Sequence, residues 1–248
     1  TRGKLFTLTR DADGSGSIDT DDIEFSGYLE GDGDFRSDEV TQLRDEADII
    51  ITNPPFSLFR EFIAWIIEGN KIFSIMGNMD AITYKEVFPL IKGNKAWLGA
   101  TIHSGDREFK IPFDRPITAK KWRVDEQGCK YVRVTGVRWF TNLEHGRRHQ
   151  PLSLLSMRGN LLHNKKMKGK KSYGQYDNFE AIEVPFSSAI PSDYKGVMGV
   201  PVSFLDKYSP EQFEILSNSA RIGINLTVNG KIPYKRIFIR HKLNTQES

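Results

Sequence analysis

The residues best suited to chemistry in this 248-residue sequence form one tetrapeptide, Asn53-Pro54-Pro55-Phe56. The exocyclic amino group of adenine or cytosine is a poor nucleophile because its lone pair is delocalised into the ring. The amide oxygen of Asn53 and the main-chain carbonyl of Pro54 can each accept one of its two N–H hydrogens, which localises the lone pair for attack on a methyl sulfonium. The prolines hold that carbonyl rigidly, and Phe56 offers a ring on which an extruded base can stack. Asn53, Pro54, Pro55 and Phe56 are therefore predicted to be catalytic.

The elements that must position this tetrapeptide are visible in the flanking pattern. An apolar, β-branched run at 48–52 predicts a strand buried in a mostly parallel sheet. Helical spacing from Leu58 to Glu68, with a stop at Gly69-Asn70, predicts an amphipathic helix. A further strand at 71–76 should bring its loop, 78–84, to the same sheet edge, where ligands of open α/β sheets bind. The pattern predicts an α/β fold with a Rossmann-like sheet.

Six segments of the sequence, in order, resemble the EcoRI-type adenine-specific DNA methyltransferases. They are Gly31–Glu39, Ala47–Arg60, Ile75–Tyr84, Val137–Leu143, Tyr176–Asn178 and Gly199–Phe213. The resemblance implies a class I methyltransferase sheet, base flipping, and transfer of a methyl group from S-adenosyl-L-methionine to adenine N6 in duplex DNA. It assigns the roles described above to Asn53, Pro54 and Phe56. It also implies that Asp34 and Phe35 lie along the adenosine of the cofactor.

One departure from this family concerns the cofactor. Its members usually present an N-terminal strand and turn that bind the methionine part, and no counterpart is evident here. Gly31-Asp32-Gly33 lacks the strand–turn–helix context of a nucleotide-binding loop. Because the sequence begins at Thr1, shortly before the catalytic tetrapeptide, we expect a chain that lacks its N-terminal cofactor-binding segment.

Charge is distributed very unevenly along the chain. Residues 1–50 hold 5 Lys/Arg and 14 Asp/Glu, a net of −9, whereas residues 101–176 hold 17 and 6, a net of +11. A basic segment of this kind favours contact with the DNA polyanion, and a solvated lysine-rich loop is the alternative. The predicted DNA-binding residues are Arg147, Arg148, Lys165, Lys166, Lys168, Lys170 and Lys171.

The segment from Asp11 to Asp22 has the oxygen-donor spacing of a calcium loop. Its flanks alternate like strands rather than helices, so a hairpin with a long polar turn is the favoured interpretation. His145 and His149 lack a third ligand, and we predict no metal site there. Cys129 is the single cysteine, which suits a reducing bacterial cytoplasm, and neither a signal peptide nor a membrane-spanning run is evident.

Four segments are predicted: an acidic β-hairpin excursion (1–30), a catalytic methyltransferase core (31–100), a strand-rich basic target-recognition region (101–180) and a C-terminal segment that completes the fold (181–248). Trp97, Trp122 and Trp139 are expected in strands. In the last segment a short helix is expected from Ser209. A closing hairpin is expected around Asn229-Gly230, with 233–240 as its second strand.

The favoured hypothesis is a DNA adenine-N6 methyltransferase of a restriction–modification system, with a cognate restriction endonuclease acting on the same site. Two alternatives remain open. Cytosine N4 or a protein glutamine side chain also presents a planar amino group to such a loop. The chain could instead be a non-catalytic DNA- or calcium-binding module in which the tetrapeptide is only a strand terminator, because Asn-Pro and Pro-Pro pairs are common turn formers.

Overall fold

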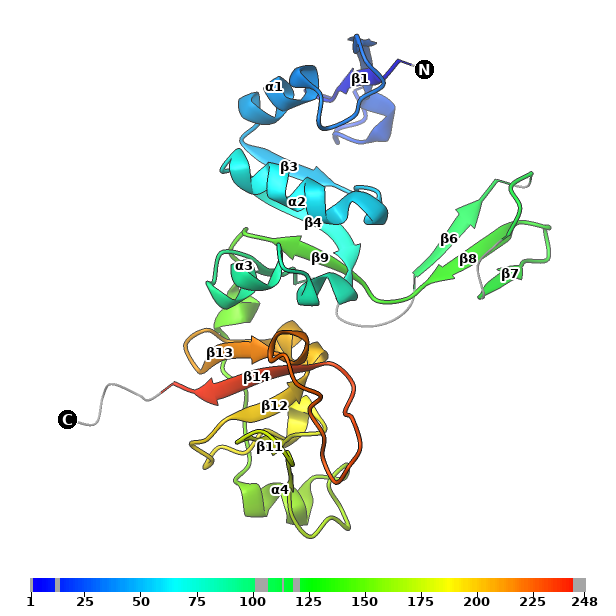
Figure 1. Ribbon diagram of the computed structural model, residues 1–248. Helices are drawn as coiled ribbons and strands as arrows, with labels where there is room; N and C mark the ends of the chain where they lie inside the picture. The colour runs from blue at the N-terminus through cyan, green and yellow to red at the C-terminus, as the bar shows by residue number, and fades with distance from the viewer. Residues whose placement is uncertain (1, 12–13, 101–106, 113, 118–120, 243–248) are drawn as a thin grey trace. The chain divides into compact units, whose positions relative to one another are not determined.

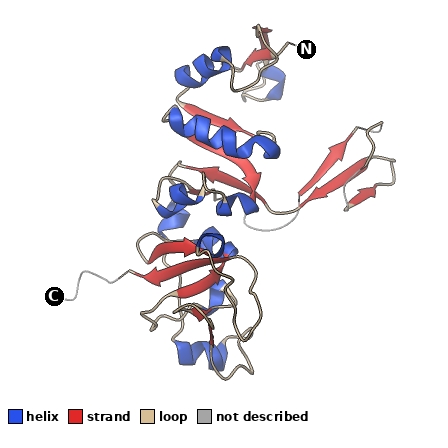
Figure 2. Cartoon of the chain, viewed as in Figure 1, coloured by secondary structure: helices blue, strands red, loops and turns tan. Residues whose placement is uncertain are grey.

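The computed structural model describes residues 2–11, 14–100, 107–112, 114–117 and 121–242 (Figure 1). Its Cα positions group into two compact units. The first comprises Thr1–Ile50 with Glu61–Ile72, and the second comprises Ile51–Arg60 with Phe73–Ser248. Helices and strands are interspersed along the chain (Figure 2). The strands pair in both antiparallel and parallel directions. The coarse prediction of an α/β protein is therefore confirmed. The four-segment organisation remains a prediction.

The first unit begins with two antiparallel strands, β1 (Lys4–Thr7) and β2 (Glu24–Tyr28). They occupy the two segments whose alternation predicts strands. Helix α1 (Asp38–Glu46) follows, and the hydroxyl of Ser37 caps it by accepting a hydrogen bond from the main-chain N–H of Val40 at 3.3 Å. The unit therefore has the predicted hairpin and a capped helix.

The turn between β1 and β2 is held by its own carboxylates. Asp11 accepts main-chain hydrogen bonds from Gly14 and Gly16, each at 2.7 Å. The short 3₁₀ helix η1 (Thr20–Asp22) leads into β2. Among the described residues no group of three or more His, Cys, Asp or Glu is arranged to hold a metal ion, and Asp13 lies outside those residues. Calcium binding by this turn is not proposed.

The tetrapeptide predicted to be catalytic lies in a strand–helix–strand unit. Strand β3 (Ile49–Thr52) precedes it, helix α2 (Phe59–Glu68) follows it, and strand β4 (Ile72–Asn78) comes next. A four-stranded sheet has the order β3-β4-β9-β5. A helical crossover is the connection that parallel neighbours require, so we expect the carboxyl ends of β3 and β4 at one edge of this sheet. A strand, a loop and a helix lie where the sequence predicts them. The predicted burial of the strand is wrong, because β3 is an edge strand in which Ile49 is 47% and Ile51 is 68% exposed. The sheet is not mostly parallel either, since β9 pairs antiparallel with both β4 and β5.

The remaining strands of this sheet are β5 (Trp97–Leu98) and β9 (Val137–Thr141), which pair antiparallel, as do β9 and β4. Helix α3 (Phe88–Lys92) lies between β4 and β5 in the chain. A separate antiparallel sheet has the order β6-β8-β7 (Figure 1). Its strands are β6 (Arg107–Ile111), β7 (Trp122–Val124) and β8 (Lys130–Val134). The three tryptophans expected in strands lie in β5, β7 and β9, which confirms that prediction.

The last third of the chain builds a five-stranded sheet in the order β10-β11-β12-β14-β13. Phe204, Phe213 and Phe238 are completely buried in its core. Helix α4 (Met157–His163) precedes the sheet in the chain. The strands are β10 (Gly174–Gln175), β11 (Ile182–Glu183), β12 (Met198–Pro201), β13 (Phe213–Asn218) and β14 (Arg236–His241).

Two local predictions for this region are wrong in part. No helix begins at Ser209: residues 210–212 form a turn and β13 follows, because alternate residues Phe213 and Ile215 are buried and pair with β14. The turn at Asn229-Gly230 is present, with φ of 51° and 72°. Its flanks, however, share one isolated bridge, and β14 pairs with β12 and β13 instead.

The described strands form four separate sheets rather than one continuous doubly wound sheet, and the Rossmann-like class I arrangement remains an expectation. None of the helices in the described residues is both long and apolar enough to span a bilayer.

Candidate active site and nucleic-acid interface

Asn53 comes directly after β3 and is exposed. Neither its side-chain amide nor the carbonyl of Pro54 takes part in a hydrogen bond with any described residue. The next carbonyl, that of Pro55, is already used, since it accepts a hydrogen bond from the main-chain N–H of Leu58 at 2.9 Å. The loop therefore holds two acceptor oxygens without a hydrogen-bond partner among the described residues, one on the exposed side chain of Asn53 and one on the main chain of the buried Pro54.

Phe56 begins the 3₁₀ helix η2 (Phe56–Leu58) and is half-buried. Phe56 is therefore neither fully buried in the core nor fully exposed to solvent. Pro54, by contrast, is buried, which fixes the start of the loop. A half-buried ring next to the exposed residue Asn53 is the arrangement expected of a stacking surface for a base.

Phe59, the first residue of α2, anchors the loop to the sheet. It is 2% exposed and packs on Phe140 of β9, with ring centroids 5.2 Å apart. The ring lies against β4 at Gly77, where an added Cβ would approach Phe59 Cε2 to 2.4 Å. Sequence analysis did not identify Gly77 as important. The available signal is a glycine inside a strand, which often marks close approach of another group.

The loop after β4 is built from its own hydrogen bonds. The side chain of Asn78 accepts from the main-chain N–H of Asp80 at 2.8 Å and starts the 3₁₀ helix η3 (Met79–Thr83). At the end of this loop the ring of Tyr84 lies under the guanidinium of Arg60, 4.1 Å from centroid to Cζ. Arg60 lies four residues after Phe56, so the Arg60–Tyr84 contact joins the loop after β3 to the loop after β4.

Asp34 and Phe35, the two residues predicted to hold the adenosine of the cofactor, both contact other side chains of the protein. Phe35 is 9% exposed and packs on Phe62 and Trp65, with centroids 5.0 and 5.6 Å away. The carboxylate of Asp34 binds the guanidinium of Arg36 at 2.6 Å, and this hydrogen-bonded cation lowers the pKa of Asp34 to about 2. The aromatic ring is a core residue and the carboxylate already has a partner. This arrangement does not fit a bound nucleoside, and we withdraw Asp34 and Phe35 as cofactor contacts.

The five lysines of the basic run are all exposed, as a contact surface for DNA requires. Their segment is anchored by Met167, which is completely buried in the middle of the run. The adjacent Tyr173 and Tyr176 are 6% exposed, so neither ring is available to a base. The exposed lysines are Lys165, Lys166, Lys168, Lys170 and Lys171.

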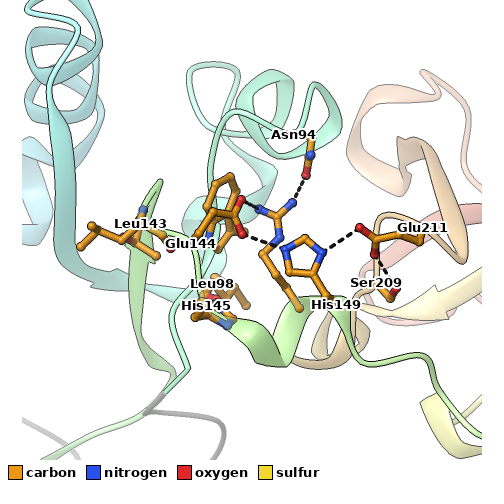
Figure 3. Close-up of polar contacts among 11 residues, drawn as sticks. Asn94, Leu98, Leu143, Glu144, His145, His149, Ser209 and Glu211 are labelled. Carbon is orange, nitrogen blue, oxygen red and sulfur yellow. Dashed lines mark hydrogen bonds and ion pairs between the residues drawn. The ribbon is translucent and has the colours of Figure 1, made fainter.

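Arg147 and Arg148 are adjacent in η4 (Gly146–His149) but face different surroundings. Arg147 is exposed and donates a hydrogen bond to the carbonyl of Ala100 at 3.0 Å. Arg148 is 4% exposed, and its guanidinium lies 3.6 Å from the ring centroid of Trp97. Arg148 also donates to Glu144 at 2.9 Å and to the side-chain oxygen of Asn94 (Figure 3). The prediction that Arg148 contacts DNA is therefore wrong, because its guanidinium is buried and already paired with Glu144 and Trp97.

His149 lies between two carboxylates (Figure 3). Its Nε2 is 2.8 Å from Glu144 and its Nδ1 is 2.7 Å from Glu211. Both ring nitrogens can donate only when the imidazole is protonated. The hydrogen bond to Glu144, and then that to Glu211, raises the pKa of His149 above its ordinary 6.5. When protonated, the ring therefore links η4 to the turn before β13.

This link predicts a pH-dependent contribution to stability. Because the pKa of His149 is higher in the folded state, the contribution is complete below about pH 6.5 and is lost as pH rises through the folded-state pKa. The melting temperature of His149→Gln should fall below wild type at acidic pH and converge with it at alkaline pH. His163→Gln, an exposed histidine of α4, is the control. A difference that does not vary with pH would contradict the assignment.

Comparison with known proteins adds an independent line of evidence. The family model described as "Adenine-specific methyltransferase EcoRI" matches residues 3–235. The chain is 44% identical over 225 residues to the Type II methyltransferase M.EcoRI of Escherichia coli, covering 90% of this chain and 66% of that protein. It thus spans about two thirds of the length of that relative.

Two relatives from mycoplasmas are also similar. The Type II methyltransferase M.MgeORF184P of Mycoplasma genitalium is 35% identical, covering 86% of this chain and 70% of that protein. M.MpnI of Mycoplasma pneumoniae, also a Type II methyltransferase, is 31% identical, covering 87% and 71%. No solved structure matches the chain.

Proposed function

Because this chain belongs to the EcoRI family of adenine-specific methyltransferases, we propose that it methylates adenine N6 in duplex DNA as part of a Type II restriction–modification system. The observation that carries the proposal is the pair of available acceptors, the Asn53 amide oxygen and the Pro54 carbonyl, at the carboxyl end of β3. The half-buried ring of Phe56 next to them supplies the surface against which the base stacks.

The mechanism that we propose follows from these groups. The target adenine leaves the duplex at a cost of a few kcal/mol, which stacking and phosphate contacts offset. Asn53 and Pro54 each accept one hydrogen bond from the N6 amino group, and the lone pair of N6 becomes available for attack. The two prolines keep the carbonyl in place before the base arrives, so little reorganisation is required.

S-Adenosyl-L-methionine supplies the methyl group in this proposal, as the family implies. The described surroundings of Asp34 and Phe35 do not fit its adenosine, so no step is assigned to those residues. The proposed setting is the bacterial cytoplasm, with a cognate restriction endonuclease that cuts the same unmethylated site.

The basic segment supplies DNA affinity in the same proposal. Arg147 and the lysine run 165–171 present exposed cations to the phosphates, and such contacts give affinity without sequence preference. The alternatives lose support from the comparisons. The matching family is adenine-specific, which disfavours cytosine N4 and protein glutamine as acceptors, and its relatives are methyltransferases rather than binding modules.

The test is expression of the full-length protein in cells that lack adenine methylation, followed by sequencing of genomic DNA for modified bases. We expect N6-methyladenine at one short recognition sequence. Methylated cytosine N4 at that sequence, or unmodified DNA despite abundant folded protein, would refute the proposal.

A further inference from the structure

A hollow of about 450 Å³ is lined by segments that are far apart in the sequence. Three of its lining residues, Arg147, Lys166 and Lys207, carry positive charges and are exposed. Cationic groups on a concave wall favour an anionic ligand. Hydroxyl groups that can donate hydrogen bonds lie in the same wall, on Ser187, Ser188 and Ser203.

The positive charge of this hollow is not cancelled by its carboxylate. Asp206 also lines the wall, but it binds the guanidinium of Arg138 at 3.0 Å, and both side chains are less than one tenth exposed. Lys166 and Lys207 form no ion pair with any residue that the structure describes. The Lys166 ammonium lies 5.1 Å from the ring centroid of Phe186, another lining residue.

Two hydrogen-bonded asparagines, Asn160 and Asn164, hold the Lys166 segment against the opposite wall. Asn164 accepts a hydrogen bond from the main-chain N–H of Lys166 at 3.1 Å and donates to the carbonyl of Ser188 at 2.8 Å. Asn164 also donates to Asn160, which is completely buried and in turn donates to the carbonyl of Ala189. Two walls of the hollow are thus fixed to each other before any ligand binds, which reduces the ordering cost of binding.

We propose that this hollow binds a backbone phosphate of the DNA substrate, between Lys166, Lys207 and Arg147. The inference rests on the proposed function, since duplex DNA is the anion it identifies. The serine hydroxyls complete the hydrogen bonds to the phosphate oxygens. Such a contact carries no base information, so it fixes where the duplex lies rather than which sequence is chosen.

The experiment measures binding of the full-length protein to a duplex of about 20 base pairs of arbitrary sequence by fluorescence anisotropy over a series of salt concentrations. The double variant Lys166→Ala/Lys207→Ala should bind about tenfold more weakly at about 0.1 M salt. The slope of log affinity against log salt should become shallower by about one. Ser203→Glu, which adds a carboxylate to the hollow and keeps both lysines, should also weaken binding.

The control is Lys92→Ala/Lys195→Ala, which removes the same charge at two exposed positions outside the hollow. Its slope should equal that of wild type. Equal loss of slope in both double variants would overturn the phosphate site and leave only a general charge effect. Wild-type protein that does not bind duplex DNA would overturn the proposed function and the site together, whereas normal binding with no methylation would overturn the function alone.

Discussion

Asn53→Ala should lower the rate of adenine methylation by about 10²- to 10³-fold, the usual effect of removing one preorganised hydrogen-bond partner from a transition state. The amide oxygen of Asn53 has no partner within the described residues, so its loss leaves no internal group unsatisfied and should not affect folding. The effect should therefore fall on the rate constant for methyl transfer. Single-turnover methylation of a duplex that contains the recognition sequence measures that constant directly.

Two further variants sharpen this test. Asn53→Asp keeps an acceptor oxygen at the same position and should retain measurable methylation. Ser57→Ala changes an exposed neighbour with no assigned role and should behave as wild type. Duplex affinity and its salt dependence should stay unchanged in Asn53→Ala, which separates chemistry from DNA binding. Methylation by Asn53→Ala at the wild-type rate would refute the catalytic assignment.

Gly77→Ala should destabilise the second unit and reduce activity, although Gly77 has no chemical role. Its new Cβ would lie 2.4 Å from Cε2 of Phe59, which is 2% exposed and also packs on Phe140. Neither the ring nor the strand has free space, so overpacking should cost about 1–3 kcal/mol of unfolding free energy. Displacement of Phe59 should also move Phe56, three residues earlier.

Urea unfolding of Gly77→Ala measures the loss of stability, and single-turnover methylation measures the displacement of the loop. Gly146→Ala is the matched control, since a Cβ there meets no atom within 4 Å. Reduction of Phe59 to leucine in the Gly77→Ala background should recover part of the stability by removing the clash. A Gly77→Ala protein as stable and as active as the control would show that Phe59 does not anchor the catalytic loop.

The sequence by itself determined the local part of this site. β-Branched residues at 48–52, two prolines and helical spacing after Leu58 predict β3, the rigid loop and α2, and all three are present. These predictions succeed because they depend on neighbours within a few residues: strand propensity, a fixed proline φ, and the 3.6-residue helical repeat. The order of the motifs also sufficed to identify the family.

Only the tertiary structure decided which candidate residues are available. Arg147 and Arg148 look equivalent in the sequence, yet Arg148 is buried over Trp97 and Arg147 is exposed. Phe35 likewise looks available in the sequence, yet its ring packs on Phe62 and Trp65. Burial and charge pairing depend on partners that are tens of residues away, and no local pattern encodes them. The long-range pairing of β13 with β14 likewise overrides the helix expected from Ser209. Lys207 and Lys166, 41 positions apart in the sequence, line one hollow only because the chain folds back on itself.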